Sequence, residues 1–285
     1  MTVCVGLALL IDALAQASVA VMILANVAVA AGLIEFNRLV RALGAAPFAA
    51  LSLAGGLFVL NWPWAFDTLA GLSAGGRLGR FYTVWGADAA VALLAVVVAV
   101  LVAHIAARQR SETAFHGAAA TVVGVCYLAL PLSLFMLFAW RLEAGAWSCV
   151  MWLLATAKAG DIAAWAVGRK LGRHRLAPIT SPRKTLEGAG AGLAASVLVS
   201  GAFGAAVCAA PVRSALIGLI VGLTGQLGDL IESALKRSAG AKQSAAWMPA
   251  FGGALDVLDS LVFSLPAGAM AMQWMFNVTV WHRGI

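Results

Sequence analysis

The sequence predicts an all-α fold: a polytopic integral membrane bundle of about eight to nine transmembrane helices. Hydrophobic residues make up 62% of the 285 residues and charged residues only 11%, and the mean hydropathy is +0.94. Soluble domains are about 45–50% apolar and about 25% charged, so this chain lies outside their range. Apolar stretches of the roughly 20 residues needed to cross a bilayer also recur along it. We therefore expect one membrane domain and no soluble domain.

Eight apolar stretches are expected to cross the membrane. They lie at 17–36, 45–61, 86–105, 117–138, 146–167, 189–209, 213–235 and 257–276. A ninth stretch, 2–14, is short and contains Asp12, and an acid within the bilayer is costly. No lysine or arginine precedes Arg38. Because a secretory signal begins with a basic segment, we expect no cleavage near the start.

The basic residues predict the orientation of the bundle. Thirteen of the 19 lysines and arginines fall in loops on one side, five fall on the other, and Lys158 lies within a span. Cytoplasmic loops carry the excess of such residues, so the polar loops near 168–188 and 236–256 are expected in the cytoplasm, with the protein in the inner (plasma) membrane. The net charge of +7 also favours anionic headgroups or nucleotides as partners. Nucleic acid is not expected, because no extended soluble domain carries the charge.

The chain divides into an N-terminal half of transmembrane scaffold helices, 1–140, and a C-terminal catalytic half, 141–285. Polar residues are sparse in the first half and concentrated after Met151. Asp88 is the one buried acid that we expect in the scaffold. It is open whether Asp88 is a structural partner at a helix end or contributes to a site.

Five polar residues near the end of the seventh span fall on one face of a helix. Asp229, Glu232, Ser233, Lys236 and Arg237 follow the spacing i, i+3, i+4, i+7 and i+8. Charges at such depth are costly in a membrane protein, so a function is the default interpretation. A pair of carboxylates can hold a divalent cation, and Lys or Arg at a helix end can hold phosphate. The pattern predicts a metal and phosphate site at the membrane surface.

A second helix carries Lys158, Asp161, Trp165 and Gly168 on one face and leads into the basic run that begins at Arg169. Two interpretations are open. Lys158 and Asp161 could neutralise each other inside the bundle as an i, i+3 pair. Alternatively, Asp161 points into the same site as the acids of the seventh span.

The loop at 176–188 contains two prolines, so it cannot be a continuous helix. Ser181 or Thr185, together with Glu187, is expected to cap the span that follows. A helix N-terminus beside Arg183 and Lys184 is a plausible phosphate cradle. The alternative is a basic loop that only anchors the topology.

A glycine-rich turn, Gly252-Gly253, precedes a span that opens with Asp256 and Asp259. Acids in a first helical turn are favoured by the helix dipole even without a ligand. Three acid-bearing helix ends and three basic loops on one side of the membrane nevertheless favour a common site.

These motifs resemble those of the integral-membrane phosphatidate cytidylyltransferases (CDP-diacylglycerol synthases). The residues that match the family's C-terminal signature are Gly228, Asp229, Glu232, Ser233, Lys236, Arg237, Lys242, Pro249, Gly252, Gly253, Asp256, Asp259 and Ser260. The residues that match the upstream pattern are Asp161, Ala164, Gly168, Arg169, Ser181, Pro182, Lys184, Thr185, Glu187 and Gly188, with Trp165 in place of a tyrosine. The specific resemblance covers about 151–262.

The chain departs from the family pattern at three points. Gln243 replaces an acid, Ala250-Phe251 replace Gly-His, and Val257 stands where the family usually has arginine. The roles of that histidine and arginine therefore cannot be carried over. Asp229 and Asp256, the acids best suited to metal, are retained.

The resemblance implies transfer of a cytidylyl group from CTP to phosphatidic acid, which gives CDP-diacylglycerol and pyrophosphate in phospholipid biosynthesis. It implies Mg²⁺, with a second, monovalent cation left open, and a homodimer is also left open. Asp229 and Asp256 are the expected metal ligands, with Asp161, Glu232 and Asp259 as ligands or supporting acids. The residues expected to contact substrate phosphates or nucleotide are Ser181, Lys184, Arg169, Ser233, Lys236, Arg237, Lys242, Gly252 and Gly253. Of these, Lys236 and Arg237 are expected to take part in catalysis with Asp229 and Asp256.

Two alternatives come from other classes of protein. A catalytically silent family member that acts as a membrane scaffold is compatible with the departures at Gln243, Phe251 and Val257. An ion-coupled carrier would also bury acids such as Asp161. Neither alternative requires consumption of CTP.

Overall fold

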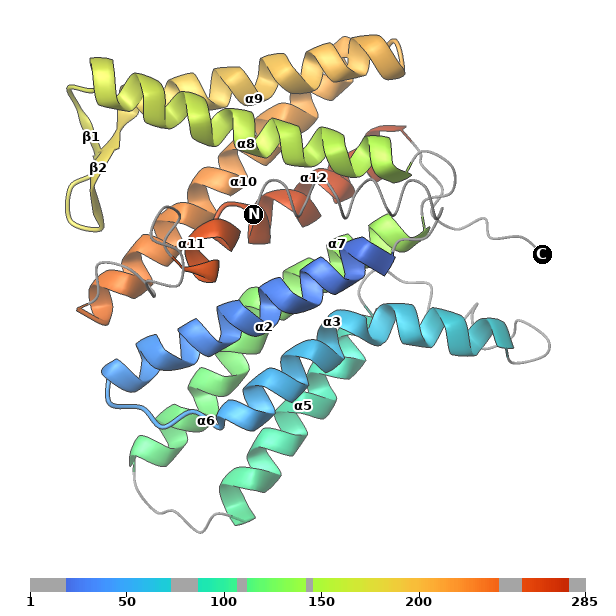
Figure 1. The fold of residues 1–285 in the computed structure, drawn as a ribbon, viewed down its shortest axis with the longest axis vertical. Helices are drawn as coiled ribbons and strands as arrows, with labels where there is room; N and C mark the ends of the chain where they lie inside the picture. The colour runs from blue at the N-terminus through green and yellow to red at the C-terminus, as the bar shows by residue number, and fades with distance from the viewer. Residues whose placement is uncertain (1–18, 73–86, 107–111, 142–145, 241–252, 277–285) are drawn as a thin grey trace. The chain divides into compact units, whose positions relative to one another are not determined.

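The computed structural model describes residues 19–72, 87–106, 112–141, 146–240 and 253–276. Within these ranges the fold is helical except for one two-stranded hairpin (Figure 1). The chain forms two compact units. Unit 1 contains Met1–Glu143 and Gly253–Leu255, and unit 2 contains Ala144–Gly252 and Asp256–Ile285.

The helices of unit 1 are α2 (Val19–Ala42), α3 (Ala49–Leu72), α5 (Ala87–Ala106), α6 (Glu112–Gly124), the π-helical turn η1 (Val125–Ala129) and α7 (Leu130–Arg141). Unit 2 contains α8 (Ala146–Leu171), β1 (Arg175–Ala177), β2 (Ser181–Thr185), α9 (Leu186–Val207), α10 (Pro211–Ser238) and α12 (Leu261–Phe276). The short helix α11 (Ala254–Leu258) begins in unit 1, and its chain continues into unit 2 at Asp256.

The expected membrane helices are present. Among the described residues, six segments are long and apolar enough to cross a bilayer: Val21–Ala42, Phe115–Ala139, Ser148–Leu171, Leu186–Val207, Pro211–Ser238 and Ala254–Phe276. Two shorter apolar helices, Ala49–Pro63 and Ala90–Ile105, match the two remaining expected stretches. The all-α membrane bundle is thereby confirmed. The number of crossings stays a prediction, and the ninth stretch, 2–14, lies outside the described residues.

Unit 1 has an apolar core in which Leu33, Val59 and Leu128 are fully buried. A polar link joins α2 to α3 within it. Each side-chain amide of Asn26 and Asn61 donates to the amide oxygen of the other, over 3.0 and 2.7 Å. Helices in a bilayer are held together by close packing and by hydrogen bonds of this kind.

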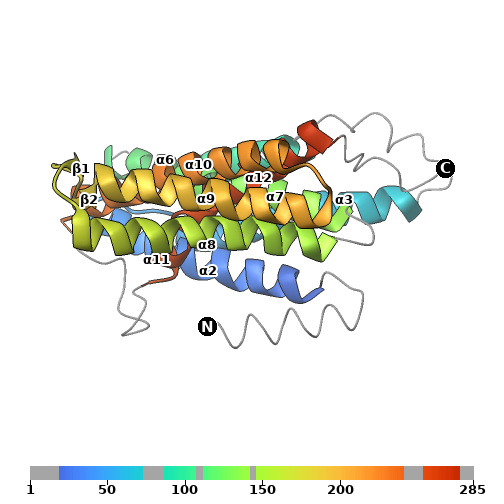
Figure 2. The ribbon, with the colours of Figure 1, turned by 90° about the horizontal axis from the view of Figure 1, so that it is seen from above.

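In unit 2, α8 and α9 lie side by side in both views (Figures 1 and 2). Small residues allow the helix backbones to approach closely. At Gly218 on α10, an added Cβ would collide with the carbonyl oxygen of Ser196 on α9. Trp152 of α8 donates its indole N–H to Ser200 Oγ of α9 over 2.9 Å.

A β-hairpin connects α8 to α9, where we expected only an irregular loop. Strands β1 and β2 are antiparallel, with Arg175 opposite Thr185 and Ala177 opposite Ser181. The prediction that the prolines prevent a continuous helix is confirmed, because one proline lies in the turn and the other in β2. The hairpin carries the basic residues of this loop back towards α10.

Thr185 caps α9, as predicted. Its hydroxyl oxygen accepts a hydrogen bond from the amide of Gly188 over 3.2 Å. Glu187 has a different role from the one expected. Its carboxylate accepts from the backbone amides of Arg173 and His174, over 3.1 and 3.2 Å, and so ties the start of the hairpin to α9.

Candidate active site

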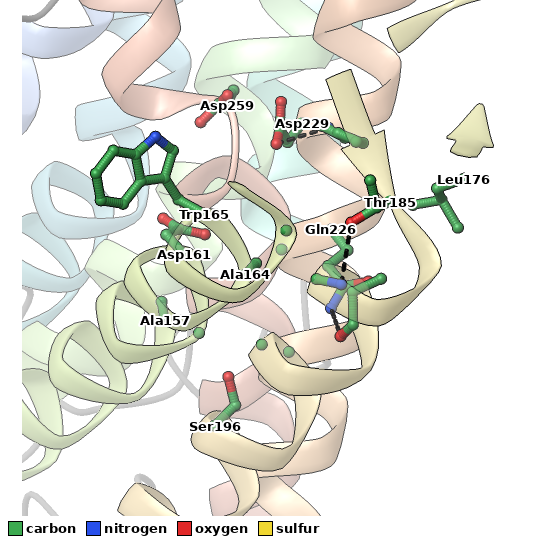
Figure 3. A pocket seen from close by; sticks show the side chains of 18 of the residues that line it. Ala157, Asp161, Ala164, Trp165, Leu176, Thr185, Ser196, Gln226, Asp229 and Asp259 are labelled. Carbon is green, nitrogen blue, oxygen red and sulfur yellow. Dashed lines mark hydrogen bonds and ion pairs between the residues drawn. The ribbon is translucent and has the colours of Figure 1, made fainter. Parts of the chain in front are cut away.

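A cavity of about 690 Å³ lies inside unit 2, between α8, the hairpin, α9, α10 and the segment that opens the last span. Figure 3 shows acids that enter it from three different parts of the chain, Asp161 on α8, Asp229 on α10 and Asp259 between α11 and α12. Asp256 also lines it. The basic residues of the lining are Lys158, Arg169, Arg183 and Lys184. The structure therefore gathers acids and bases from distant parts of the sequence around one space.

The hairpin delivers Lys184 to the acid on α10. Lys184 Nζ lies 2.6 Å from Asp229 Oδ2. The ammonium atom is buried, and strand β2 holds its side chain next to the capped start of α9. An ammonium group withdrawn from water is stable only beside an anion, so this position suits a carboxylate or a phosphate.

Lys236 lies between two carboxylates. Its Nζ is 2.9 Å from Glu232 Oε2 and 2.5 Å from Asp256 Oδ1. The Glu232 side chain is only 1% exposed, and that of Lys236 is 15% exposed. Lys236 therefore has a carboxylate on either side, and removal of these partners would leave a largely buried charge uncompensated.

A third cluster joins α8 to the last span. Lys158 Nζ lies 2.9 Å from Asp161 Oδ2 and 3.2 Å from Ser260 Oγ. Ser260 Oγ in turn donates to Asp161 Oδ2 over 2.9 Å. Both interpretations of the sequence hold in part, since Lys158 and Asp161 form the expected pair and Asp161 also lines the cavity with Asp229.

Three carboxylates form a group that could hold a metal ion. Asp229, Glu232 and Asp259 each offer one oxygen, and these oxygens lie within 4.8 Å of one another. Glu232 Oε1 is buried and has no hydrogen-bond partner among the described residues. Asp259 accepts from the amide of Ser260 over 2.5 Å, and it forms no ion pair with a described lysine or arginine. A group of oxygens with unused acceptor capacity suits a hard divalent cation such as Mg²⁺.

Asp229 and Asp256 are the metal ligands expected from the sequence. In the structure Asp229 belongs to the acidic group, whereas Asp256 is bound to Lys236. Glu232 and Asp259, which we expected as ligands or supporting acids, join Asp229 instead. The role of Asp256 as a ligand stays a prediction.

The structure shows fewer contacts to the acidic group and its lysines for the other predicted site residues. Arg169 lines the cavity, with its guanidinium 5.4 Å from the centre of the Trp165 ring. Ser181 lies opposite Ala177 at the start of β2. The predicted residues that are described but not part of the cavity lining are Ser181, Glu232, Ser233, Lys236, Arg237 and Gly253. Lys242, Gly252, Gln243 and Phe251 lie outside the described residues, as does the side chain of Asp88.

Sequence reasoning missed Gln226. It lines the cavity, and its Nε2 donates to the backbone carbonyl of Ala189 on α9 over 2.9 Å (Figure 3). It precedes Asp229 by three residues, so the helical spacing that selected the acid face of α10 would also have selected it. Small residues such as Gly192, Ser196 and Gly222 also line the cavity.

A sequence profile described as the cytidylyltransferase family matches residues 1–275. The chain belongs to this family. The shared extent includes both units, so the first half is as much a part of the cytidylyltransferase fold as the half that contains the cavity.

Curated relatives resemble parts of this cytidylyltransferase-family chain. The phosphatidate cytidylyltransferase of Synechocystis sp. is 47% identical over 111 residues, which are 38% of this chain and 37% of the relative. That of Chlamydia muridarum is 41% identical over 129 residues, 43% of this chain and 42% of the relative. A protein of Escherichia coli named as uncharacterized, YnbB, is 39% identical over 118 residues, 41% of this chain and 40% of the relative. The matches thus span about two fifths of the length of these relatives.

Proposed function

We propose that this protein transfers the cytidylyl group of CTP to phosphatidic acid, giving CDP-diacylglycerol and pyrophosphate. The observation that carries the proposal is the acidic group Asp229, Glu232 and Asp259, of which Glu232 is buried, next to two lysines, Lys184 and Lys236. This combination occurs among membrane-length helices in a member of the cytidylyltransferase family. Relatives named as phosphatidate cytidylyltransferases support the choice of nucleotide and lipid.

The reaction places its main demand on charge neutralisation. A phosphate oxygen of phosphatidic acid attacks the α-phosphorus of CTP, a new P–O–P linkage forms, and the bond to the β-phosphate breaks with pyrophosphate as the leaving group. The attacking oxygen is already an anion, so no strong general base is required. Catalysis then depends on alignment of the two phosphates and on stabilisation of their negative charge.

Asp229, Glu232 and Asp259 would hold Mg²⁺, and Asp256 would support them from the other side of Lys236. The unused acceptor Oε1 of Glu232 and the all-oxygen donor set fit this ion. When bound, the ion supplies positive charge to the phosphates that react. Asp161 lies on the same cavity and holds Lys158 in place.

When substrate binds, each of two lysines would exchange a carboxylate partner for a phosphate group. Lys184 and Lys236 are paired with carboxylates before substrate binds. Arg169 and Arg183 line the same cavity and add positive charge at its edge. We also propose that further predicted residues contact the nucleotide or the lipid phosphate. These are Ser181, Ser233, Arg237, Lys242, Gly252 and Gly253.

The lipid would meet the nucleotide at this cavity while its acyl chains stay in the bilayer. The lining contains small and apolar residues such as Ala157 and Val221 as well as charged ones. This mixed lining supports a headgroup beside the charged residues of the cavity. We place the site on the cytoplasmic side of the inner membrane, where CTP is made. We also propose that the protein forms a homodimer and that a monovalent cation accompanies Mg²⁺.

The test uses purified full-length protein in detergent micelles, given phosphatidic acid, CTP and Mg²⁺, with pyrophosphate release as the readout. ATP, GTP and UTP serve as parallel nucleotides. Asp229→Asn is the site variant, and Asn61→Ala, in the α2–α3 amide pair, is the matched control. The proposal requires lipid-dependent release with CTP that Asp229→Asn abolishes and Asn61→Ala preserves. No release with any nucleotide from folded protein would favour the silent scaffold or the carrier instead.

A further inference from the structure

Glu35 is a buried carboxylate in α2, outside the site residues expected from the sequence. Glu35 is only 2% exposed and belongs to a membrane-length helix. Both carboxylate oxygens have partners. Oε1 accepts from the amide of Ala254 over 2.8 Å, and Oε2 accepts from the amide of Leu255 over 2.9 Å. All three residues belong to unit 1.

The two amides that Glu35 accepts from are the first two of α11. The first N–H groups of a helix have no partner within the helix. A carboxylate that accepts from two of them forms charge-assisted hydrogen bonds and is favoured by the helix dipole. Because each oxygen has its own donor, the contact sets the direction of the helix as well as its position.

The geometry points to Glu35 as a positioning residue for Asp256, the residue that directly follows Leu255. Asp256 Oδ1 in turn lies 2.5 Å from Lys236 Nζ. Glu35 thus holds the start of the short helix in which Asp256 is the third residue. This inference rests on the proposed function, because only catalysis gives the direction of Asp256 a consequence.

The alternative is that Glu35 is an ordinary cap whose loss only lowers stability. The two cases differ in what a charge-removing substitution does. Glu35→Gln keeps the size of the side chain but only one of its two acceptor oxygens. It places an NH₂ group, which cannot accept, opposite the other backbone amide. A positioning role predicts that kcat falls while the KM values change little, because the binding residues are untouched. If Glu35 has only a structural role, less of the protein folds, but the kcat of each folded molecule stays unchanged.

The first experiment compares kcat and KM for CTP and phosphatidic acid in full-length wild type, Glu35→Gln, Glu35→Ala and Asn61→Ala. Asn61→Ala is the control, because it removes a partly buried polar contact from the same unit, outside α11. We expect kcat to fall about tenfold in Glu35→Gln and further in Glu35→Ala, with KM within about threefold of wild type and with Asn61→Ala near wild type. Wild-type kcat in both Glu35 variants would overturn the inference. If Glu35→Ala does not fold, Glu35→Gln decides alone.

A second readout does not depend on activity. Amide hydrogen exchange should become at least about tenfold faster in a peptide that covers 253–260 in the Glu35 variants, while peptides from α9 stay unchanged. If wild type shows no cytidylyl transfer but this local change occurs, the proposed function fails and the control of α11 by Glu35 stands. If exchange at 253–260 is unchanged, the inference fails whatever the activity.

Discussion

Lys184 Nζ lies 2.6 Å from Asp229 Oδ2, which joins the hairpin between α8 and α9 to the acid face of α10. A short two-stranded element therefore delivers a cation to a site made otherwise by helices. Its neighbour Thr185 caps α9, so the lysine has little freedom to move away from the acid. This contact makes the hairpin part of the candidate active site.

Lys184→Met should weaken nucleotide binding more than it slows the chemical step. The substitution removes a buried ammonium group from the cavity lining and leaves Asp229 without its partner. We expect KM for CTP to rise about tenfold. Steady-state kinetics at fixed phosphatidic acid measure it. Arg175→Met is the matched control, because Arg175 is on the same hairpin but donates to the Pro182 carbonyl oxygen; an equal effect in both variants would contradict a specific role for Lys184.

Glu232→Gln should raise the Mg²⁺ concentration needed for half-maximal activity by about tenfold, since the acidic group loses one of three charges. Lys236 keeps Asp256 as its partner, so the buried ammonium is not left alone. A Mg²⁺ titration of pyrophosphate release measures the shift. Thr224→Ala serves as the control, because Thr224 is on the same helix but its hydroxyl donates to the Ile220 carbonyl oxygen of α10 itself. An unchanged Mg²⁺ titration in Glu232→Gln would remove Glu232 from the metal site.

Thr185→Ala should lower the stability of unit 2 by about 1 kcal/mol, because the amide of Gly188 loses its acceptor. Thermal unfolding in detergent micelles measures the change. Thr185→Ser keeps the hydroxyl and should stay close to wild type. Equal melting of the alanine and serine variants would show that the cap contributes nothing measurable.

Substitution by alanine should change the melting temperature differently at two glycines, Gly218 on α10 and Gly190 on α9. At Gly218 an added Cβ would collide with the Ser196 carbonyl oxygen, whereas at Gly190 nothing lies within 4 Å. Gly218→Ala should therefore lower the melting temperature, and Gly190→Ala should leave it unchanged or raise it, since alanine is favoured over glycine in a helix by about 0.5–1 kcal/mol. Similar melting of the two variants would mean that close approach of α9 and α10 is not required.

The helical part of the fold follows from the sequence because apolar length is a local property. The eight expected stretches all coincide with helices. The hairpin was missed because its strands are short and basic and show no alternation of apolar residues. Glu187 also ties the backbone just before β1 to the start of α9, a contact that no local pattern reveals.

The acids of the site could be selected from the sequence, but not their grouping. Asp256 and Asp259 are three positions apart and appear equivalent in a helical projection. In the structure α11 ends at Leu258, and Asp259 joins Asp229 while Asp256 meets Lys236. Glu35 was missed for a similar reason, because its partners lie 219 and 220 positions away. A glutamate within an expected membrane span was the available signal.

The amide pair of Asn26 and Asn61 also bears on how the chain enters the membrane. Neither residue is well suited to lipid alone, because an unsatisfied amide in hydrocarbon is costly. Their helices, α2 and α3, are successive among the described elements, so the pair can form as soon as the second one is synthesised. We expect α2 and α3 to leave the translocon together as a helical hairpin. Crosslinking of nascent chains to the translocon should then show α2 held back until α3 emerges, and its early release into lipid would disprove the expectation.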